Sequence, residues 1–236
     1  CAGQDELEVA INYHKKSVEI NPDYAEGYNN LGIAFQKLGL FEEAVKNYKK
    51  TLKLKPDFSL AYNNLGVVLK SLNKLDEALL TSKKAIELDP KFADAHNNIG
   101  AILQDLGNYE EAYKFYKKAI KLKSSYSDAY YNLGILLKKL GKIEECVENF
   151  HKAVIANQKN NRAYSNYLFN LNYLTKYDDN YYIEEAKKFG LSLKKIDDQL
   201  CIPYKYNVNP EKLTVGFVSA DLRNHPVGYY LIDTLK

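Results

Sequence analysis

The chain has 236 residues, of which 46% are hydrophobic and 27% charged, so its composition is that of a folded protein and excludes a largely disordered one. Its net charge of +3 is small and its lysines alternate with acids, so we expect no nucleic-acid partner. No apolar stretch approaches the roughly 18–20 residues of a membrane span, and the polar first residues do not resemble a secretory signal, so we expect no membrane partner.

The three cysteines exclude some kinds of site. Cys1, Cys146 and Cys201 are an odd number and have no CxxC or CxxH spacing, which argues against a disulfide framework and predicts no metal site. Free thiols favour a reducing, cytoplasmic location. Because the chain begins with Cys1 and contains no Met, we expect it to be an excised or incomplete piece of a longer protein.

The first predicted element is a single amphipathic helix over residues 5–20, which ends before Pro22. Its pattern corresponds to the second helix of the units that follow. We therefore expect the first unit to lack its opening helix and the amino end to fray.

Four copies of a 34-residue unit follow. Gly32, Gly66, Gly100 and Gly134 recur with a period of 34, the difference between successive numbers. Each unit predicts two amphipathic helices that approach closely at small residues such as Gly66 and Ala78. A left-handed residue is expected to end the first helix of each unit. The residues in that position are Gly39, Asn73, Gly107 and Gly141.

Further columns keep the same period. They are Tyr28, Tyr62, His96 and Tyr130; Leu31, Leu65, Ile99 and Leu133; Ala10, Ala44, Ala78 and Ala112, with Cys146 next; and Pro22, Pro56 and Pro90. The order of these columns resembles the tetratricopeptide repeat, and the second full copy reads AYNNLGVVLKSLNKLDEALLTSKKAIELDP. The resemblance implies an all-α, right-handed superhelix (an α-α solenoid) that binds protein. We expect residues 1–158 to form a partial first repeat and four full repeats.

An asparagine recurs two residues before each column glycine, at Asn30, Asn64, Asn98 and Asn132, and once more at Asn166. This column is hard to explain by packing, because asparagine is a poor helix former and a core position favours an apolar side chain. An amide both donates and accepts hydrogen bonds, as a peptide backbone does. The column is similar to the asparagine ladder lining the repeats of the O-linked N-acetylglucosamine transferases, which implies a partner polypeptide in extended form. The alternative is that each asparagine bonds a neighbouring helix carbonyl. The predicted peptide-binding residues are Asn30, Asn64, Asn98, Asn132 and Asn166.

Two neighbouring columns qualify this prediction. Asn29, Asn63 and Asn97 adjoin the ladder, and one interpretation is that they widen the polar strip, with Tyr131 in the fourth place. Repeats that clamp the C-terminal carboxylate of chaperones need polar groups one residue after each glycine. That position holds Ile33, Val67, Ala101 and Ile135, so such a clamp is disfavoured.

Beyond the repeats, residues 159–200 predict a degenerate repeat and a helical cap, with one helix over residues 181–195 broken at Gly190. Residues 201–236 predict a linker, a short buried strand over residues 213–219, a polar loop and the start of a helix. Strand, loop and helix in this order open an α/β domain.

The sequence KLTVGFVSADLRNHPVGYYL, residues 212–231, resembles the start of the catalytic domain of the O-linked N-acetylglucosamine transferases. The resemblance implies a truncated Rossmann-like domain in which His225 is catalytic in the intact parent and Asp221 supports the same loop. In that family the later part of the fold holds the nucleotide sugar. We therefore expect no cofactor and no activity in this piece, and a UDP-sugar donor for its parent.

Two functions follow. The first is the N-terminal part of a bacterial-type protein O-glycosyltransferase, whose repeats hold an acceptor polypeptide on their concave face. The alternative is a non-enzymatic tetratricopeptide adaptor for the assembly of protein complexes, which needs only the repeats. His14, His96 and His151 stand singly on repeat columns, and we predict no metal or catalytic role for them.

Overall fold

The computed structural model of the protein describes residues 2–175 and 177–197, and the regular structure of these residues is entirely α-helical. The chain divides into two units, Cys1–Lys195 and Ile196–Lys236, and the arrangement below is that of the first. The helices are α1 (Ala2–Ile20), α2 (Ala25–Lys37), α3 (Phe41–Leu54), α4 (Ser59–Ser71), α5 (Leu75–Leu88), α6 (Ala93–Asp105), α7 (Tyr109–Leu122), α8 (Ser127–Lys139), α9 (Ile143–Ala156), α10 (Asn161–Leu171) and α11 (Asp179–Asp197). The predicted helical repeat is confirmed, whereas the predicted strand lies outside the described residues.

Each of the four full units is a helical hairpin with a left-handed residue at its turn, as predicted. The backbone φ is 76° at Gly39, 58° at Asn73, 81° at Gly107 and 73° at Gly141. At the first turn the Leu40 N–H donates to the Phe35 carbonyl at 2.9 Å, and the Gly39 N–H donates to the Gln36 carbonyl at 3.0 Å. This pair of bonds is the Schellman pattern, which satisfies the last carbonyls of the helix and turns the chain toward α3.

The two helices of each hairpin meet at the glycine column. A Cβ atom on Gly100 would lie 2.7 Å from Cε1 of Tyr116, and a Cβ on Gly134 would lie 2.7 Å from Cε1 of Phe150. At Gly66 the nearest groups are the Ser82 hydroxyl and, at 3.3 Å, the Ala78 carbonyl. The absent glycine side chain is therefore the space that an aromatic ring of the second helix fills in three of the four repeats.

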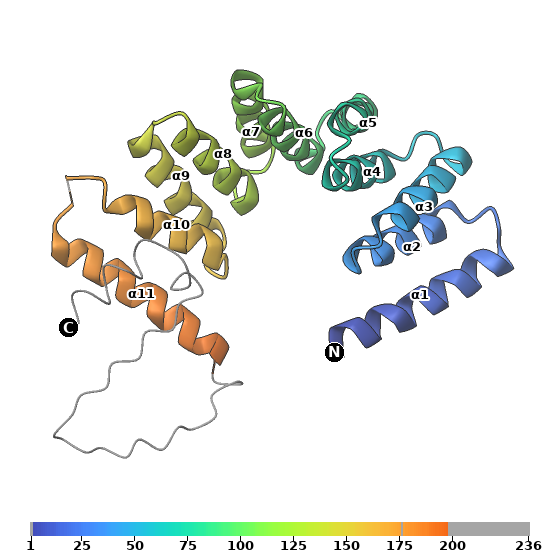
Figure 1. Cartoon of the computed structure of the whole chain (residues 1–236), viewed down its shortest axis with the longest axis horizontal. Helices are drawn as coiled ribbons and strands as arrows, with labels where there is room; N and C mark the ends of the chain where they lie inside the picture. The colour runs from blue at the N-terminus through green and yellow to red at the C-terminus, as the bar shows by residue number, and fades with distance from the viewer. Residues whose placement is uncertain (1, 176, 198–236) are drawn as a thin grey trace, which may run out of the picture. The chain divides into compact units, whose positions relative to one another are not determined.

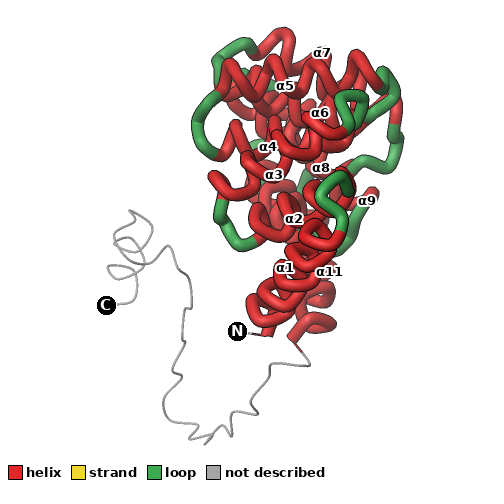
Figure 2. The backbone as a smooth tube through the Cα atoms, turned by 90° about the vertical axis from the view of Figure 1, so that its right-hand side faces the viewer, coloured by secondary structure: helices red, strands yellow, loops and turns green. Residues whose placement is uncertain are grey.

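The hairpins stack in chain order, and the first helices occupy the inner side of the stack. Each second helix packs on the next first helix, while α2, α4, α6 and α8 also pack directly on one another. Figure 1 shows the helix pairs following an arc with α4 on its inner side and α5 on its outer side. Figure 2 shows the loops along the margins of the stack, outside the helices. The closely packed first helices therefore form one continuous inner wall.

At the amino end, α1 is a single helix that takes the place of a second helix, as predicted. It packs on α2, where the space beside Gly27 is filled by Tyr24 and by Val18 of α1. Its residues Ala10 and His14 are half-buried, whereas the equivalent Ala44 and Tyr48 are fully buried. The difference follows because none of the described helices covers this side of α1.

At the other end, α10 and α11 pack through tyrosine and phenylalanine rings. The rings of Tyr164 and Phe189 stack with their centroids 4.7 Å apart, and the hydroxyls of Tyr167 and Tyr181 are 3.0 Å apart. The predicted break at Gly190 is wrong, because α11 runs through this residue without interruption. One glycine costs a helix only about 1 kcal/mol relative to alanine, which does not by itself end a helix.

The domain boundaries at residues 158 and 200 stay a prediction, and residues 201–236 lie outside the described part. None of the described helices is both long and apolar enough to cross a lipid bilayer.

Replacing glycine with alanine should have opposite effects on stability at Gly100, which contacts the second helix, and at Gly190, which does not. Gly100→Ala should lower the free energy of unfolding by about 1–3 kcal/mol, because the new methyl group displaces the Tyr116 ring. Gly190→Ala should raise it by about 0.5–1 kcal/mol, because no atom lies within 4 Å of the added Cβ and alanine favours the helix. Urea unfolding followed by circular dichroism measures both. Equal effects of the two substitutions would contradict the proposed close approach.

Candidate functional site

The surface of each first helix that faces away from its partner helix forms the candidate site. Successive residues of an α-helix are about 100° apart, so the residue two before a column glycine points about 200° away from the glycine contact. The residues six before, one after and five after the column glycine lie on this same side, and we call this surface the inner face. In α10, which has no column glycine, Leu168 takes the equivalent position. From α2 to α10 its residues are Glu26, Asn30, Ile33 and Lys37; Leu60, Asn64, Val67 and Ser71; Asp94, Asn98, Ala101 and Asp105; Asp128, Asn132, Ile135 and Lys139; and Arg162, Asn166, Phe169 and Tyr173.

The asparagines of the inner face join consecutive repeats. The Nδ2 of Asn98 donates to the Oδ1 of Asn63 at 2.8 Å, and the Nδ2 of Asn132 donates to the Oδ1 of Asn97 at 3.0 Å. A longer bond of 3.4 Å has the same form between Asn64 and Asn29. We call these three bonds the amide rungs. The partner is a side-chain amide of the preceding repeat rather than the backbone carbonyl that the sequence suggested as the alternative.

The rungs leave part of each donor amide free. In each pair the donor uses one of its two N–H groups, and its own Oδ1 accepts no hydrogen bond from any described residue. The donors Asn64, Asn98 and Asn132 are half-buried, whereas the acceptors Asn63 and Asn97 are buried. A row of oriented and partly exposed amide groups therefore runs along the inner face.

The two ends of the predicted ladder differ from its centre. Asn30 makes no rung, because α1 is a second helix and offers no amide in the acceptor position. Asn166 donates instead to the Arg162 carbonyl of its own helix at 2.9 Å, because Tyr131 replaces the acceptor asparagine. The structure thus places all five predicted residues on one face and links the central three to the preceding repeat.

An apolar column lies beside the asparagines. In the sequence, these apolar residues served only as an argument against a carboxylate clamp. Ile33, Val67, Ala101 and Ile135 are half-buried on the inner face, and Phe169 continues the column with 55% of its surface exposed. Helical spacing places each of them about 60° around the helix from the asparagine three residues earlier. The inner face therefore offers hydrogen-bonding groups and apolar surface side by side. The sequence itself shows this pattern, because an asparagine and, three residues later, an apolar residue recur in each 34-residue unit.

Two of the histidines on the repeat columns make packing contacts. The Nε2 of His96 is 3.0 Å from the Pro90 carbonyl, and the ring of His151 stacks on Tyr167 with centroids 4.9 Å apart. In the part of the chain that the structure describes, no three His, Cys, Asp or Glu side chains gather as metal ligands would. His225 and Asp221, assigned to the parent's active site by resemblance, lie outside the described residues.

Comparison with known families identifies the repeat. Sequence models of the tetratricopeptide repeat match residues 25–58 and 93–126, 3–39 and 68–107, and 47–79 and 115–148. The chain contains tetratricopeptide repeats. These matches end at residue 148 and do not reach the residues that resemble a transferase.

Solved structures show the same tetratricopeptide fold. The crystal structure of MamA is 26% identical, with a TM-score of 0.57, and the match covers 67% of this chain and 92% of that chain. A thermophilic TPR protein from Thermus thermophilus is 22% identical with a TM-score of 0.64, covering 72% and 93%. YrrB, described as a TPR protein with an unusual peptide-binding site, is 22% identical with a TM-score of 0.53, covering 79% and 92%. No curated protein sequence matches the chain.

Cys146 takes an alanine position of the tetratricopeptide pattern and should be chemically inert. It is fully buried, and burial raises the pKa of its thiol from 9.0 to about 11. At pH 8 the reactive thiolate should thus be about a hundred-fold scarcer than at an unshifted thiol, before burial slows access further. In a Cys1→Ser, Cys201→Ser background, thiol titration with a chromogenic disulfide should be slow in buffer and fast in guanidinium chloride. Fast reaction of the folded protein would contradict the buried placement.

Proposed function

We propose that the inner face of the repeats binds an extended polypeptide through its asparagine column. The observation that carries this proposal is the set of amide rungs, which hold Asn64, Asn98 and Asn132 in one line with an unused Oδ1 on each. A peptide backbone offers the complementary N–H and C=O groups at every residue, whatever its side chains. YrrB, a protein of the same fold described as having an unusual peptide-binding site, adds support.

The rungs favour binding because they order the amides before a ligand arrives. Immobilising a free side chain on binding costs about 0.5–1.5 kcal/mol, and a side chain already held by a hydrogen bond loses less. The apolar column from Ile33 to Phe169 then contacts side chains of the peptide that point into the wall. Backbone bonds supply affinity in this arrangement, and the apolar contacts supply preference among sequences.

Such a module serves either of two proteins. A non-enzymatic adaptor needs only the repeats, and every matched family model is a repeat model. The acceptor-binding arm of a protein O-glycosyltransferase is the second proposal, and it rests on the resemblance of residues 212–231 alone. In that protein the repeats would present Ser or Thr of the acceptor near His225, with a UDP-sugar as donor. The gene sequence beyond the codon for Lys236 separates them, since only the transferase requires a following α/β domain.

The asparagine column predicts a loss of affinity that a matched surface change does not cause. A peptide selected from a displayed random library against the whole chain, and then labelled with fluorescein, is the probe. Asn64→Ala with Asn98→Ala should weaken its binding about tenfold to a hundred-fold, because each removed amide is worth about 0.5–1.5 kcal/mol. Fluorescence anisotropy measures the change. Asn149→Ala is the control, because Asn149 is a half-buried asparagine of α9, a second helix, and bonds its own helix at the Glu145 carbonyl.

A third variant separates binding from stability. Removing a rung also removes a link between repeats, so the double variant loses some free energy of unfolding. The side chain of Asn30 makes no hydrogen bond to any described residue. Asn30→Ala should therefore weaken the binding of the peptide without changing the unfolding midpoint. Unchanged affinity in both Asn30→Ala and the folded double variant would refute the asparagine column as the binding site.

A further inference from the structure

The junction between α8 and α10 lacks two kinds of polar link found earlier in the stack, an ion pair that occurs between α4 and α6 and the amide rung that occurs at each earlier junction. Lys70 of α4 pairs with Asp105 of α6 at 2.8 Å. Two repeats later the equivalent residues are Lys138 and Tyr173, so the lysine has lost its carboxylate partner. Its Nζ lies instead 4.8 Å from the centroid of the Phe169 ring.

The second broken link is an amide rung. Tyr131 stands where Asn29, Asn63 and Asn97 accept, and the Arg162 guanidinium lies 5.1 Å from the Tyr131 ring centroid. The inner-face position of Arg162 holds Glu26, Asp94 and Asp128 in three of the four earlier repeats, so the charge is reversed at α10. On the inner face, α10 thus carries an arginine where three earlier repeats carry an acidic residue, and aromatic residues where the earlier repeats carry Ile, Val or Ala and a polar residue.

The aromatic rings of the junction are unusually exposed. Phe169 is 55% exposed and Tyr173 is 60% exposed, and their rings meet edge to face with centroids 5.8 Å apart. The aliphatic residues in the equivalent position of Phe169, from Ile33 to Ile135, are half-buried. Neighbouring exposed aromatic rings on a concave wall are typical of a surface that a partner covers.

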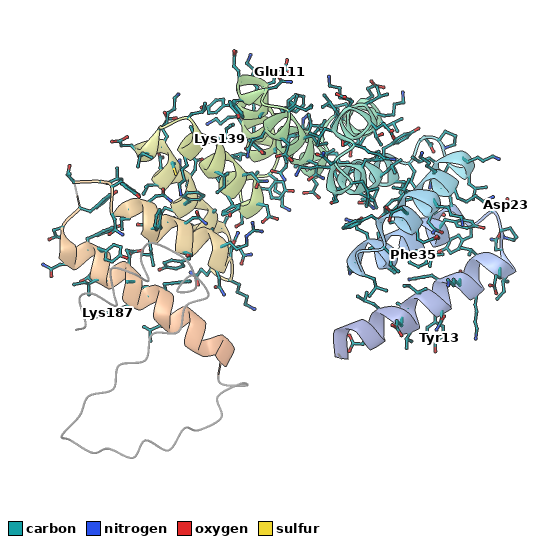
Figure 3. All side chains as sticks on the ribbon, viewed as in Figure 1. Tyr13, Asp23, Phe35, Glu111, Lys139 and Lys187 are labelled. Carbon is teal, nitrogen blue, oxygen red and sulfur yellow. The ribbon has the colours of Figure 1, made fainter. Side chains whose placement is uncertain are left out.

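The three cations of the junction lack acidic partners. Lys138, Lys139 and Arg162 form no ion pair with any Asp or Glu among the described residues, and each instead lies over an aromatic ring. Figure 3 shows Lys139 on α8. A cation over a ring face still has N–H groups for a carboxylate, five of them in arginine. Lys138 lies at the exposed Phe169 ring and Arg162 lies at the Tyr131 ring, whereas Lys139 lies over Tyr109 of α7. The two cations between α8 and α10, beside two exposed rings, are complementary to an acidic segment with a large apolar side chain.

We propose that the α8–α10 junction is an anchor site for an acidic stretch of the bound polypeptide that carries an aromatic residue. The inference rests on the proposed peptide-binding function and names the chemistry of one part of the peptide. The aromatic residue packs on Phe169 and Tyr173, and neighbouring side-chain carboxylates pair with Lys138 and Arg162. The anchor gives the peptide a polarity that the uniform amide rungs cannot give, because its acidic stretch binds only at the α10 end.

Synthetic peptides test the anchor directly on the whole chain. The probe is a fluorescein-labelled peptide of alternating Glu and Ser with one central Trp, amidated so that a terminal carboxylate plays no part. Two matched peptides replace the Trp with Ala or every Glu with Lys. The probe should bind at least about tenfold tighter than either, with an affinity that falls as salt increases. Equal binding of the three peptides would overturn the anchor and leave the asparagine column untouched.

Variants assign the binding to the junction. Phe169→Ala should lower the affinity for the Trp peptide to that for the Ala peptide. Lys138→Gln with Arg162→Gln should make the affinity for the Trp peptide less dependent on salt. These side chains are on the surface, so the variants should keep the unfolding midpoint. Lys70→Gln is the matched control, because Lys70 occupies the same repeat position but is paired with Asp105. The anchor is overturned if Lys70→Gln weakens the probe as much as the junction variants do, or if single-stranded oligothymidine binds tighter than the peptide.

The outcome is separable from that for the proposed function. The library-selected peptide reports on the asparagine column through Asn30→Ala, and the Glu–Trp probe reports on the junction through Phe169→Ala. If Asn30→Ala weakens the binding of the library-selected peptide but the synthetic peptides bind equally well, only the anchor is refuted. Preference for the Glu–Trp probe with no effect of the asparagine variants refutes the amide-based proposal and places the polypeptide at the junction alone.

Discussion

The close contact between each column glycine and the second helix of its hairpin is the constraint on which the repeat depends. A ring fills the space of the missing side chain at Gly32, Gly100 and Gly134, and a serine fills it at Gly66. The two tyrosines of this set also reach the first helix with their hydroxyls, since Tyr48 donates to Gln36 at 2.8 Å and Tyr116 to Gln104 at 3.2 Å. The contact therefore sets both the distance between the helices and their rotation about their axes.

That rotation decides what the inner wall presents. With the glycine side turned toward the second helix, the asparagine two residues earlier must face the other way, and the first helices pack on one another along this wall. Each repeat adds one asparagine and one residue of the apolar column. A single contact in the core, repeated with the period of the chain, thus produces a regular inner face with regular chemistry.

The amide rungs show that a structural and a binding role do not exclude each other. The buried acceptor asparagines would cost free energy without partners, and the rung from the next repeat supplies one. The same bond fixes the donor amide and leaves its oxygen available. Where the rung is replaced, at Tyr131, the wall changes to rings and cations, so regularity ends at the place where the chain offers a more specific surface.

The sequence by itself determined the period, the hairpins, the turns and the face that carries the asparagines, because these depend on local spacing and on residues such as Gly39 and Asn73 that tolerate positive φ. It did not determine the partners of the asparagines, since a rung joins Asn98 to Asn63 in another helix and depends on how the repeats stack. It also placed a break at Gly190, where Phe189 packs on Tyr164 and the helix continues. Tertiary structure decided these points because contacts between residues distant in the chain outweigh a local propensity of about 1 kcal/mol.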